Sequence, residues 1–169
     1  MSAEGSLEAR VSRLEAFQAI SELKARYARL ADAKYTASHE RVAPDEWHRI
    51  AAQQAACFTE DARWEGGAKF GGMLQGRDAL TGWFARSPWR FALHYYVAQE
   101  VRVVAAERAE ARWRLWQIGL PTEGRVPVLL AGVTREHYRR DDQGWLIERM
   151  SFEEIHTVEL TGSELKTVR

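Results

Sequence analysis

The segment FALHYYVAQEVRV, residues 91–103, predicts a long β-strand that carries one histidine inside an otherwise apolar run. Side chains alternate across a strand, so Ala92, His94, Tyr96 and Ala98 share one face. Small residues beside the two large ones leave space in front of them, which a pocket needs and a packed core avoids. We therefore expect this face, and His94 with it, to line a cavity. The alternative is a structural histidine whose ring is simply hydrogen-bonded.

Three further strands are expected after this one, which spans about 90–104. They lie near 109–119, 126–140 and 145–158 and are rich in Val, Leu, Ile, Trp and Tyr. The short polar sequences AERAE, PTEGR and RDDQG separate them and are typical of hairpin turns. Long consecutive strands with short connections favour an antiparallel meander.

Helices are predicted before these strands. Apolar residues at three- and four-residue steps predict a long helix over 6–34, with Ser6 as its N-cap. A second helix is expected over 45–57, then a short strand at 62–67 and a short helix over 76–86. Helices first and strands last give an α+β architecture. We expect a strongly bent, mostly antiparallel sheet wrapped over the long helix, enclosing a cone-shaped cavity.

Length and charge limit the classes of function. A chain of 169 residues is typical of one domain, which we place at 6–158 between a disordered N-terminal tail, 1–5, and a polar tail, 159–169. Lys plus Arg and Asp plus Glu are both 24, so the net charge is zero, which argues against a nucleic-acid or anionic-membrane surface. No apolar run approaches the ~20 residues of a membrane span.

The cysteine and histidine content points to a cytoplasmic protein without a structural metal. Cys57 is the only cysteine, so no internal disulfide forms, which fits a reducing compartment. The five histidines are scattered rather than grouped at zinc-site spacing. The N-terminal residues contain no apolar segment typical of a signal peptide. We expect neither a metal nor a cofactor.

Four stretches of the chain resemble one family. They are AISELKARYARLADAKY, FTEDARWEG with LQGRDAL, LHYYVAQEVRV and HYRRDDQGWLIERM. Together they resemble the SnoaL-like branch of the nuclear transport factor 2-like superfamily over residues 10–158. Within it, the chain looks most like the cofactor-free lyases scytalone dehydratase, bile-acid 7α-dehydratase and lindane dehydrochlorinase, and the formaldehyde-releasing lyases of lignin dimers. The resemblance implies a cone-shaped α+β barrel that assembles as a homo-oligomer, with a trimer favoured over a dimer.

The same resemblance implies the catalytic residues. These lyases pair a histidine on the strand after the short helix with an aspartate near the end of the first helix; those positions here are His94 and Asp32. The dehydratases place a tyrosine shortly before the aspartate, here Tyr27. The dehydrochlorinase has an arginine in its last strand, where this chain has Met150, with Arg149 beside it.

The chemistry suits an elimination. Imidazole, with an unperturbed pKa of about 6.5, can remove a proton, and a carboxylate on one ring nitrogen fixes the tautomer. Tyr27 is the candidate acid or hydrogen-bond donor. It lies five residues before Asp32, about 140° around a helix, so both reach one cavity only if the helix is ending there. The expected substrate is a hydrophobic aromatic or polycyclic alcohol, with these candidate pocket residues: Tyr35, Phe58, Trp64, Tyr96, Trp113, Trp116 and Met150.

Three functions remain open at this stage. The first is the lyase, releasing water or, by retro-aldol-type cleavage, formaldehyde from a hydroxymethyl group. The second is a ketosteroid-isomerase-like or polyketide-cyclase-like enzyme in which Asp32 is the base. The third is a non-catalytic small-molecule-binding module, favoured if Asp32 lies out of hydrogen-bond reach of His94 or if the cavity is packed shut.

Overall fold

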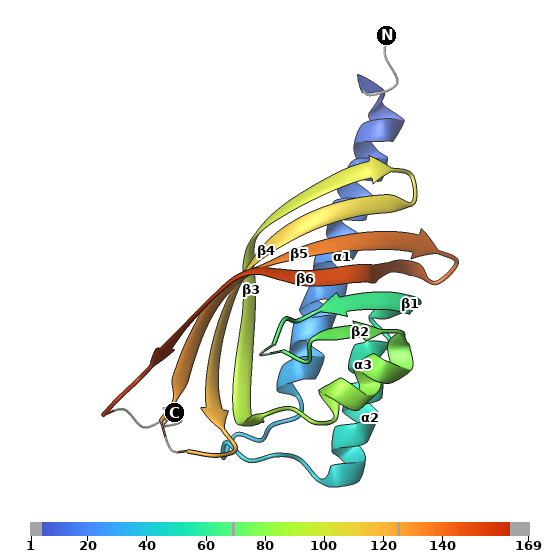
Figure 1. Ribbon diagram of the computed structural model, residues 1–169. Coiled ribbons are helices and arrows are strands. Elements are labelled where there is room, and N and C mark those ends of the chain that lie inside the picture. Colours follow the sequence, from blue (N-terminus) through green and yellow to red (C-terminus); the bar gives the residue numbers. More distant parts are fainter. Residues whose placement is uncertain (1–4, 69, 125, 163–169) are drawn as a thin grey trace.

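The computed structural model describes residues 5–68, 70–124 and 126–162, which form three helices and one six-stranded sheet (Figure 1). The predicted tails, 1–5 and 159–169, fall largely outside these residues. The elements in chain order are α1 (Leu7–Asp32), α2 (Pro44–Ala55), β1 (Phe58–Glu65), β2 (Met73–Gln75), α3 (Arg77–Phe84), β3 (Trp89–Ala105), β4 (Arg108–Pro121), β5 (Val128–Asp141) and β6 (Gly144–Glu159).

The sheet has the strand order β2-β1-β6-β5-β4-β3. Neighbouring strands are antiparallel except β1 and β6, which run parallel, so the expected α+β class and mostly antiparallel sheet are confirmed. The expected barrel is wrong, because the edge strands β2 and β3 do not pair with each other in the described chain. The sheet instead curves around α1 and remains open (Figure 1).

Irregular pairing accounts for the curvature of the long strands. The β3–β4 register shifts between Val97 and Glu100, where Ala98 has a φ of 49°. The β5–β6 register shifts between Val133 and Thr134. An extra residue in one strand bends it and increases its twist. Each long strand therefore has two arms, and the arm with residues 89–97 lies near the C-terminal end of α1.

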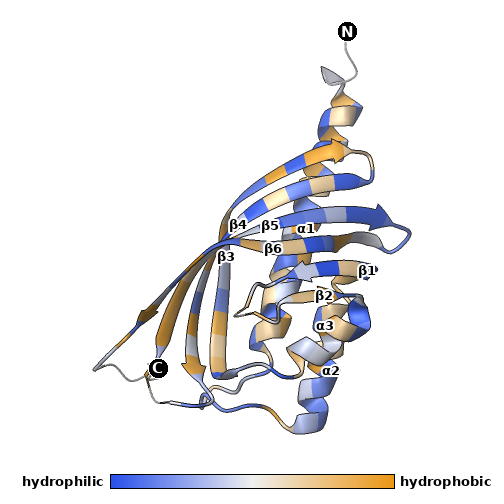
Figure 2. Ribbon diagram, viewed as in Figure 1, coloured by the Kyte–Doolittle hydropathy of each residue, from blue (hydrophilic) through white to orange (hydrophobic). Residues whose placement is uncertain are grey.

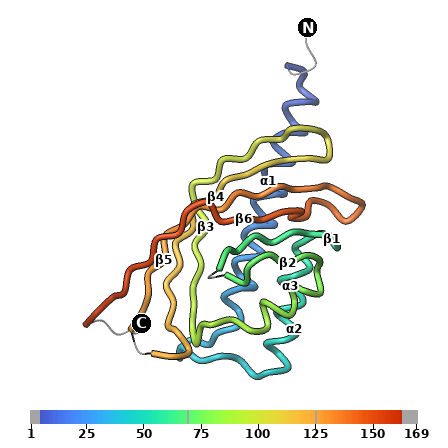
Figure 3. Tube along the Cα trace, in the orientation of Figure 1, coloured from blue at the N-terminus to red at the C-terminus, as the bar shows by residue number. Residues whose placement is uncertain are grey.

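Helix α1 begins and ends at polar residues that were singled out from the sequence. Its N-cap Ser6 accepts a hydrogen bond from the Ala9 N–H at 3.1 Å. It ends at Asp32, two residues before the predicted end, so the Asp32 side chain projects from the last turn. Helices α2 and α3 lie at this same end, opposite the N-terminus (Figure 3). The three helix ends and one arm of the sheet thus converge there.

The first turns of α1 extend beyond the core. Leu7 and Leu14 are 72% and 69% exposed, and Ala16 is the first buried residue. The hydropathy colouring shows apolar residues on this projecting part (Figure 2). The predicted apolar face is present along α1, but in its first two turns no other element of the described chain packs against it. No helix in the described residues is both long and apolar enough to span a membrane.

The interior contains a charged pair beside its apolar side chains. Lys24 of α1 donates to Glu136 of β5 at 2.5 Å, and both side chains are at most 1% exposed. Glu136 also accepts from Thr134 at 2.8 Å and from the Tyr138 hydroxyl. Burial lowers the pKa of Lys24, which the carboxylate opposes. The apolar core around the pair includes Ile20, Leu23, Phe58, Leu80, Trp113, Ile147 and Met150.

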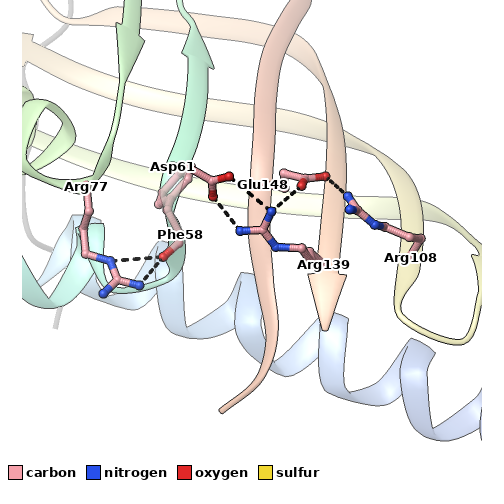
Figure 4. A network of polar contacts seen from close by, with 6 residues as sticks. All are labelled: Phe58, Asp61, Arg77, Arg108, Arg139 and Glu148. Carbon is pink, nitrogen blue, oxygen red and sulfur yellow. Dashed lines mark hydrogen bonds and ion pairs between the residues drawn. The ribbon is translucent and has the colours of Figure 1, made fainter. Parts of the chain in front are cut away.

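Ion pairs connect the strands on the outer surface. Asp61 of β1 and Glu148 of β6 both bind Arg139 of β5, and Glu148 also binds Arg108 of β4 (Figure 4). Arg77 at the start of α3 donates to the Phe58 carbonyl at 2.7 Å. Exposed pairs of this kind each contribute about 0–1 kcal/mol, so they support the sheet order without deciding it.

Candidate active site

His94 and Asp32 are joined by two hydrogen bonds. The imidazole Nδ1 lies 2.8 Å from Asp32 Oδ1, and the His94 backbone N–H donates to the same oxygen at 3.0 Å. A carboxylate only accepts, so Nδ1 carries the proton and the neutral ring has its lone pair on Nε2. The side chains are 16% and 26% exposed. The pair is therefore fixed in orientation but reachable by a ligand.

The imidazole faces a cavity of about 70 Å³. His94 and Tyr96 both line it, whereas Tyr95 and Val97 point outward and are 56% and 44% exposed. The predicted alternation is confirmed at these positions. Helix α1 contributes Tyr27 to the lining, and the residues just after the helix contribute Lys34 and Tyr35. The opposite wall is aromatic and contains Trp64, Phe70, Trp83, Phe84, Trp89 and Phe152.

Tyr27 shares this cavity with the histidine, although Asp32 is five residues away on the same helix. Tyr27 is 4% exposed and its ring packs edge-on against Phe58 and Tyr96 at 5.8 and 5.9 Å. Burial, with the nearby Glu136 carboxylate, raises the pKa of the Tyr27 phenol well above its usual range. Tyr27 therefore keeps its proton at neutral pH and acts as a hydrogen-bond donor.

Three of the predicted pocket residues line the cavity, namely Tyr35, Trp64 and Tyr96. Tyr35 OH lies 3.1 Å from Ser87 Oγ, and burial raises its pKa to about 12. Trp64 Nε1 donates to the Phe70 carbonyl at 2.6 Å, which holds the indole in the wall.

The other four predicted pocket residues are not among the described residues that line this cavity. Phe58 and Met150 are fully buried beneath it, and Trp113 donates to the Tyr138 hydroxyl at 3.1 Å deeper in the core. Trp116 is 47% exposed because it lies on the outer face of β4, one residue out of step with the inward-facing positions. Arg149 also points away from the cavity and pairs with Glu65 at 2.8 Å.

Four polar residues of the lining were missed by sequence reasoning, and one of them is Ser87, the partner of Tyr35. Lys34 and Gln54 line the cavity together, with Lys34 Nζ donating to Gln54 Oε1 at 3.0 Å. Gln117 of β4 also lines it and pairs in register with His94. A signal was available for Gln117, because it is the single polar residue within the apolar strand sequence LWQIGL, residues 115–120. Gln54, in the last turn of α2, had no such signal.

No group of three or more His, Cys, Asp or Glu side chains in the described chain is placed to hold a metal ion. The donors around the cavity are instead phenols, amides and one ammonium group. The site thus combines one oriented imidazole, several hydrogen-bond donors and an aromatic wall.

Comparison with known families gives a clear match. Residues 45–151 fit the family described as SnoaL-like domain, which covers more than half of the chain. The chain belongs to this family. The matched segment contains His94 and Gln117 of the SnoaL-like domain, while Tyr27 and Asp32 lie before it. No curated protein sequence matches the chain.

Solved structures share the fold at low sequence identity. A hexachlorocyclohexane dehydrochlorinase, LinA-type3 from Novosphingobium barchaimii, has a TM-score of 0.77 and 18% identity, covering 94% of this chain and 99% of its own. A putative scytalone dehydratase from Novosphingobium aromaticivorans has a TM-score of 0.73 and 18% identity, covering 92% and 94%. An NTF2-like protein with a cystatin-like fold from the same species has a TM-score of 0.65 and 21% identity, covering 94% and 93%. At these identities the likeness establishes the fold of the SnoaL-like domain.

Proposed function

We propose that this protein is a cofactor-independent lyase that acts on a hydrophobic aromatic or polycyclic alcohol. The observation that carries the proposal is the hydrogen bond of 2.8 Å between His94 and Asp32 at the edge of an aromatic-walled cavity. The fold is also that of proteins named as a dehydrochlorinase and a scytalone dehydratase. A cytoplasmic homo-oligomer, with a trimer favoured, remains part of the proposal.

The residues have distinct roles in a dehydration. His94 Nε2 removes a proton from the carbon next to the alcohol carbon, and the C–H electron pair becomes the new C=C bond. The C–O bond breaks, and the leaving hydroxyl takes the proton that His94 removed, so it departs as water and the neutral imidazole is regenerated. Asp32 stabilises the imidazolium that forms, and the protonated Tyr27 phenol donates a hydrogen bond to the substrate oxygen.

The retro-aldol variant uses the same base. His94 removes the proton of a hydroxymethyl O–H, the C–C bond breaks, and formaldehyde is released while the electron pair passes to the remaining carbon. That carbon then takes the proton from the imidazolium, which regenerates the base. The two reactions differ in product, so one assay separates them. We propose dehydration as the default because it requires nothing of the substrate beyond an acidic C–H beside the alcohol.

The test is turnover of a panel of aromatic diols, hydroxylated polycyclics and hydroxymethyl-bearing diaryl compounds. Ultraviolet absorbance follows the new conjugated C=C bond, and a colorimetric assay follows formaldehyde. His94→Gln should lower kcat by about 10²–10⁴-fold. Asp32→Asn should lower kcat strongly with the fold intact, because an amide that donates to Nδ1 selects the wrong tautomer.

The matched control is His156→Gln, because His156 is an exposed histidine of β6. It should leave kcat and KM unchanged. Near-wild-type turnover in both His94→Gln and Asp32→Asn would refute the proposal. Loss in Asp32→Asn alone, with isomerised product, would indicate a carboxylate base, and tight binding without turnover across the panel would indicate a binding module.

A further inference from the structure

Gln117 presents a buried hydrogen-bond donor to the cavity. Its side chain is 3% exposed, and its Nε2 group has no hydrogen-bond partner in the described part of the chain. It lies on β4 directly opposite His94 in the strand register, and both residues line the cavity. A buried donor without an acceptor costs about 1–3 kcal/mol, so natural proteins rarely retain one without a ligand or water to accept it.

Lys34 presents a second donor to the same cavity. Its Nζ donates to Gln54 Oε1 at 3.0 Å and to the Phe84 carbonyl at 3.2 Å, which uses two of the three ammonium hydrogens. The residue is 4% exposed, and none of the ion pairs formed by the described residues includes it. A buried ammonium without a carboxylate partner favours a ligand that brings negative charge.

The charge state of Lys34 supports this reading. Its pKa is lowered to about 8, mainly by burial; the nearby Asp32 carboxylate opposes this shift and the Arg41 guanidinium adds to it. At neutral pH the amine is therefore mostly protonated. The lining also contains the phenols of Tyr27, Tyr35 and Tyr96, and burial raises the pKa of each, so all three keep their protons at neutral pH. The polar side of the cavity is thus rich in donors and carries a positive charge.

We propose that Gln117 and Lys34 bind an acceptor oxygen of the substrate that carries or develops negative charge, so that the pocket selects oxygenated aromatic ligands over unsubstituted ones. The proposal extends the proposed function. It rests on that function only in treating the bound ligand as a substrate. Where the substrate carries such an oxygen conjugated with the carbon that loses the proton, that oxygen holds the electron pair as an oxyanion until the C–O bond breaks and the pair forms the C=C bond. Gln117 and Lys34 then stabilise the oxyanion while the imidazole holds the proton.

The test uses para-nitrophenol, whose phenolate is yellow, and nitrobenzene, which has the same ring and nitro group but no hydroxyl. Binding is measured by quenching of the cavity tryptophans, and ionisation of the bound probe by absorbance. The wild-type protein should bind the phenolate preferentially and lower the apparent pKa of the probe. Gln117→Leu and Lys34→Met should each weaken phenolate binding about tenfold or more, since a hydrogen bond to a charged group contributes at least that much, and leave nitrobenzene binding unchanged.

Further variants keep the test decisive. Gln117→Glu retains the size of the side chain but replaces the donor with a carboxylate, so it should abolish the phenolate preference even if Gln117→Leu folds poorly. Gln53→Leu alters an exposed glutamine of α2 and should change neither probe. An unchanged phenolate preference in Gln117→Glu and Lys34→Met would overturn the inference.

The same measurement separates this inference from the proposed lyase. His94→Gln removes the base but leaves both donors, so it should retain the phenolate preference whatever happens to turnover. Loss of the preference in His94→Gln alone would assign oxyanion binding to the imidazole and refute the role of Gln117 and Lys34. Retained preference without any lyase activity in the wild-type protein would support the oxyanion site and remove the proposed reaction.

Discussion

Neutralising Glu136 should destabilise the protein far more than neutralising a surface carboxylate. Glu136→Gln leaves the Lys24 ammonium 1% exposed with no charged partner, held against the Tyr96 ring at 3.6 Å. Removing one member of a buried ion pair costs about 3–5 kcal/mol, because the other charge stays desolvated. That is a large fraction of a typical stability of about 5–15 kcal/mol.

The magnitude differs between the two members of the pair. In Lys24→Met, the Glu136 carboxylate keeps its bonds from Thr134, at 2.8 Å, and from Tyr138. We therefore expect a loss at the lower end, about 3 kcal/mol. The double variant Lys24→Met/Glu136→Gln has no buried charge and should recover at least about 2 kcal/mol of the summed losses.

Urea denaturation followed by tryptophan fluorescence measures these differences. With a slope of about 2 kcal/mol/M, Glu136→Gln should lower the midpoint by roughly 2 M. The control is the exposed pair Arg102–Glu110, whose side chains are 74% and 41% exposed; Glu110→Gln should cost about 1 kcal/mol or less. Equal losses in Glu136→Gln and Glu110→Gln, or strictly additive losses in the double variant, would refute the reasoning.

Three further outcomes are expected. The pKa of Lys34 is about 8 in the folded protein and 10.5 in the free side chain, so the unfolded chain binds more protons between pH 8 and 10.5. The free energy of unfolding of the wild type, relative to that of Lys34→Met, should therefore rise by roughly 3 kcal/mol across this pH window. A difference that does not change with pH in urea titrations would contradict this. Gly119→Ala would place a Cβ 2.6 Å from the Trp89 ring and should cost about 1–3 kcal/mol, whereas Gly5→Ala, with no atom within 4 Å, should be neutral in the same assay. Ser6→Ala removes the N-cap bond and should lower the free energy of local opening of the first turns of α1 by about 1 kcal/mol, which speeds amide exchange there about fivefold. The urea midpoint reports global unfolding and should not move, because these turns lie outside the core.

Much of the fold could be predicted from local patterns. The apolar steps of α1, the proline that opens α2 and the alternation along β3–β6 place each long element within a few residues of its observed bounds. These signals are local, because helix periodicity and strand alternation depend on neighbouring residues. The open edge of the sheet could not be predicted in this way, since closure depends on whether two strands distant in sequence meet.

The alternation of side chains along β3 and β4 explains which pocket residues were predicted correctly. His94 and Tyr96 were placed correctly because strand alternation holds over this arm of β3; Ala98, expected on the same face, is exposed because the register shifts after Val97. Trp116 was misplaced because residue type alone suggested a pocket wall, whereas its neighbours Leu115 and Gln117 occupy the inner face. Aromatic residues occur on both faces of a sheet, so residue type does not show which face a given side chain occupies. The strand register decides this.

The sequence by itself determined the α+β class, the strand with His94 on its cavity face and an aspartate near the end of the first helix. Only the tertiary structure decided that Asp32 reaches His94 at 2.8 Å, and that Lys34, Gln54 and Gln117 line the same cavity as His94. The physical reason is distance along the chain. Asp32 and His94 are 62 residues apart, and contacts of that kind depend on how α1 packs against the bent sheet, which no local pattern encodes.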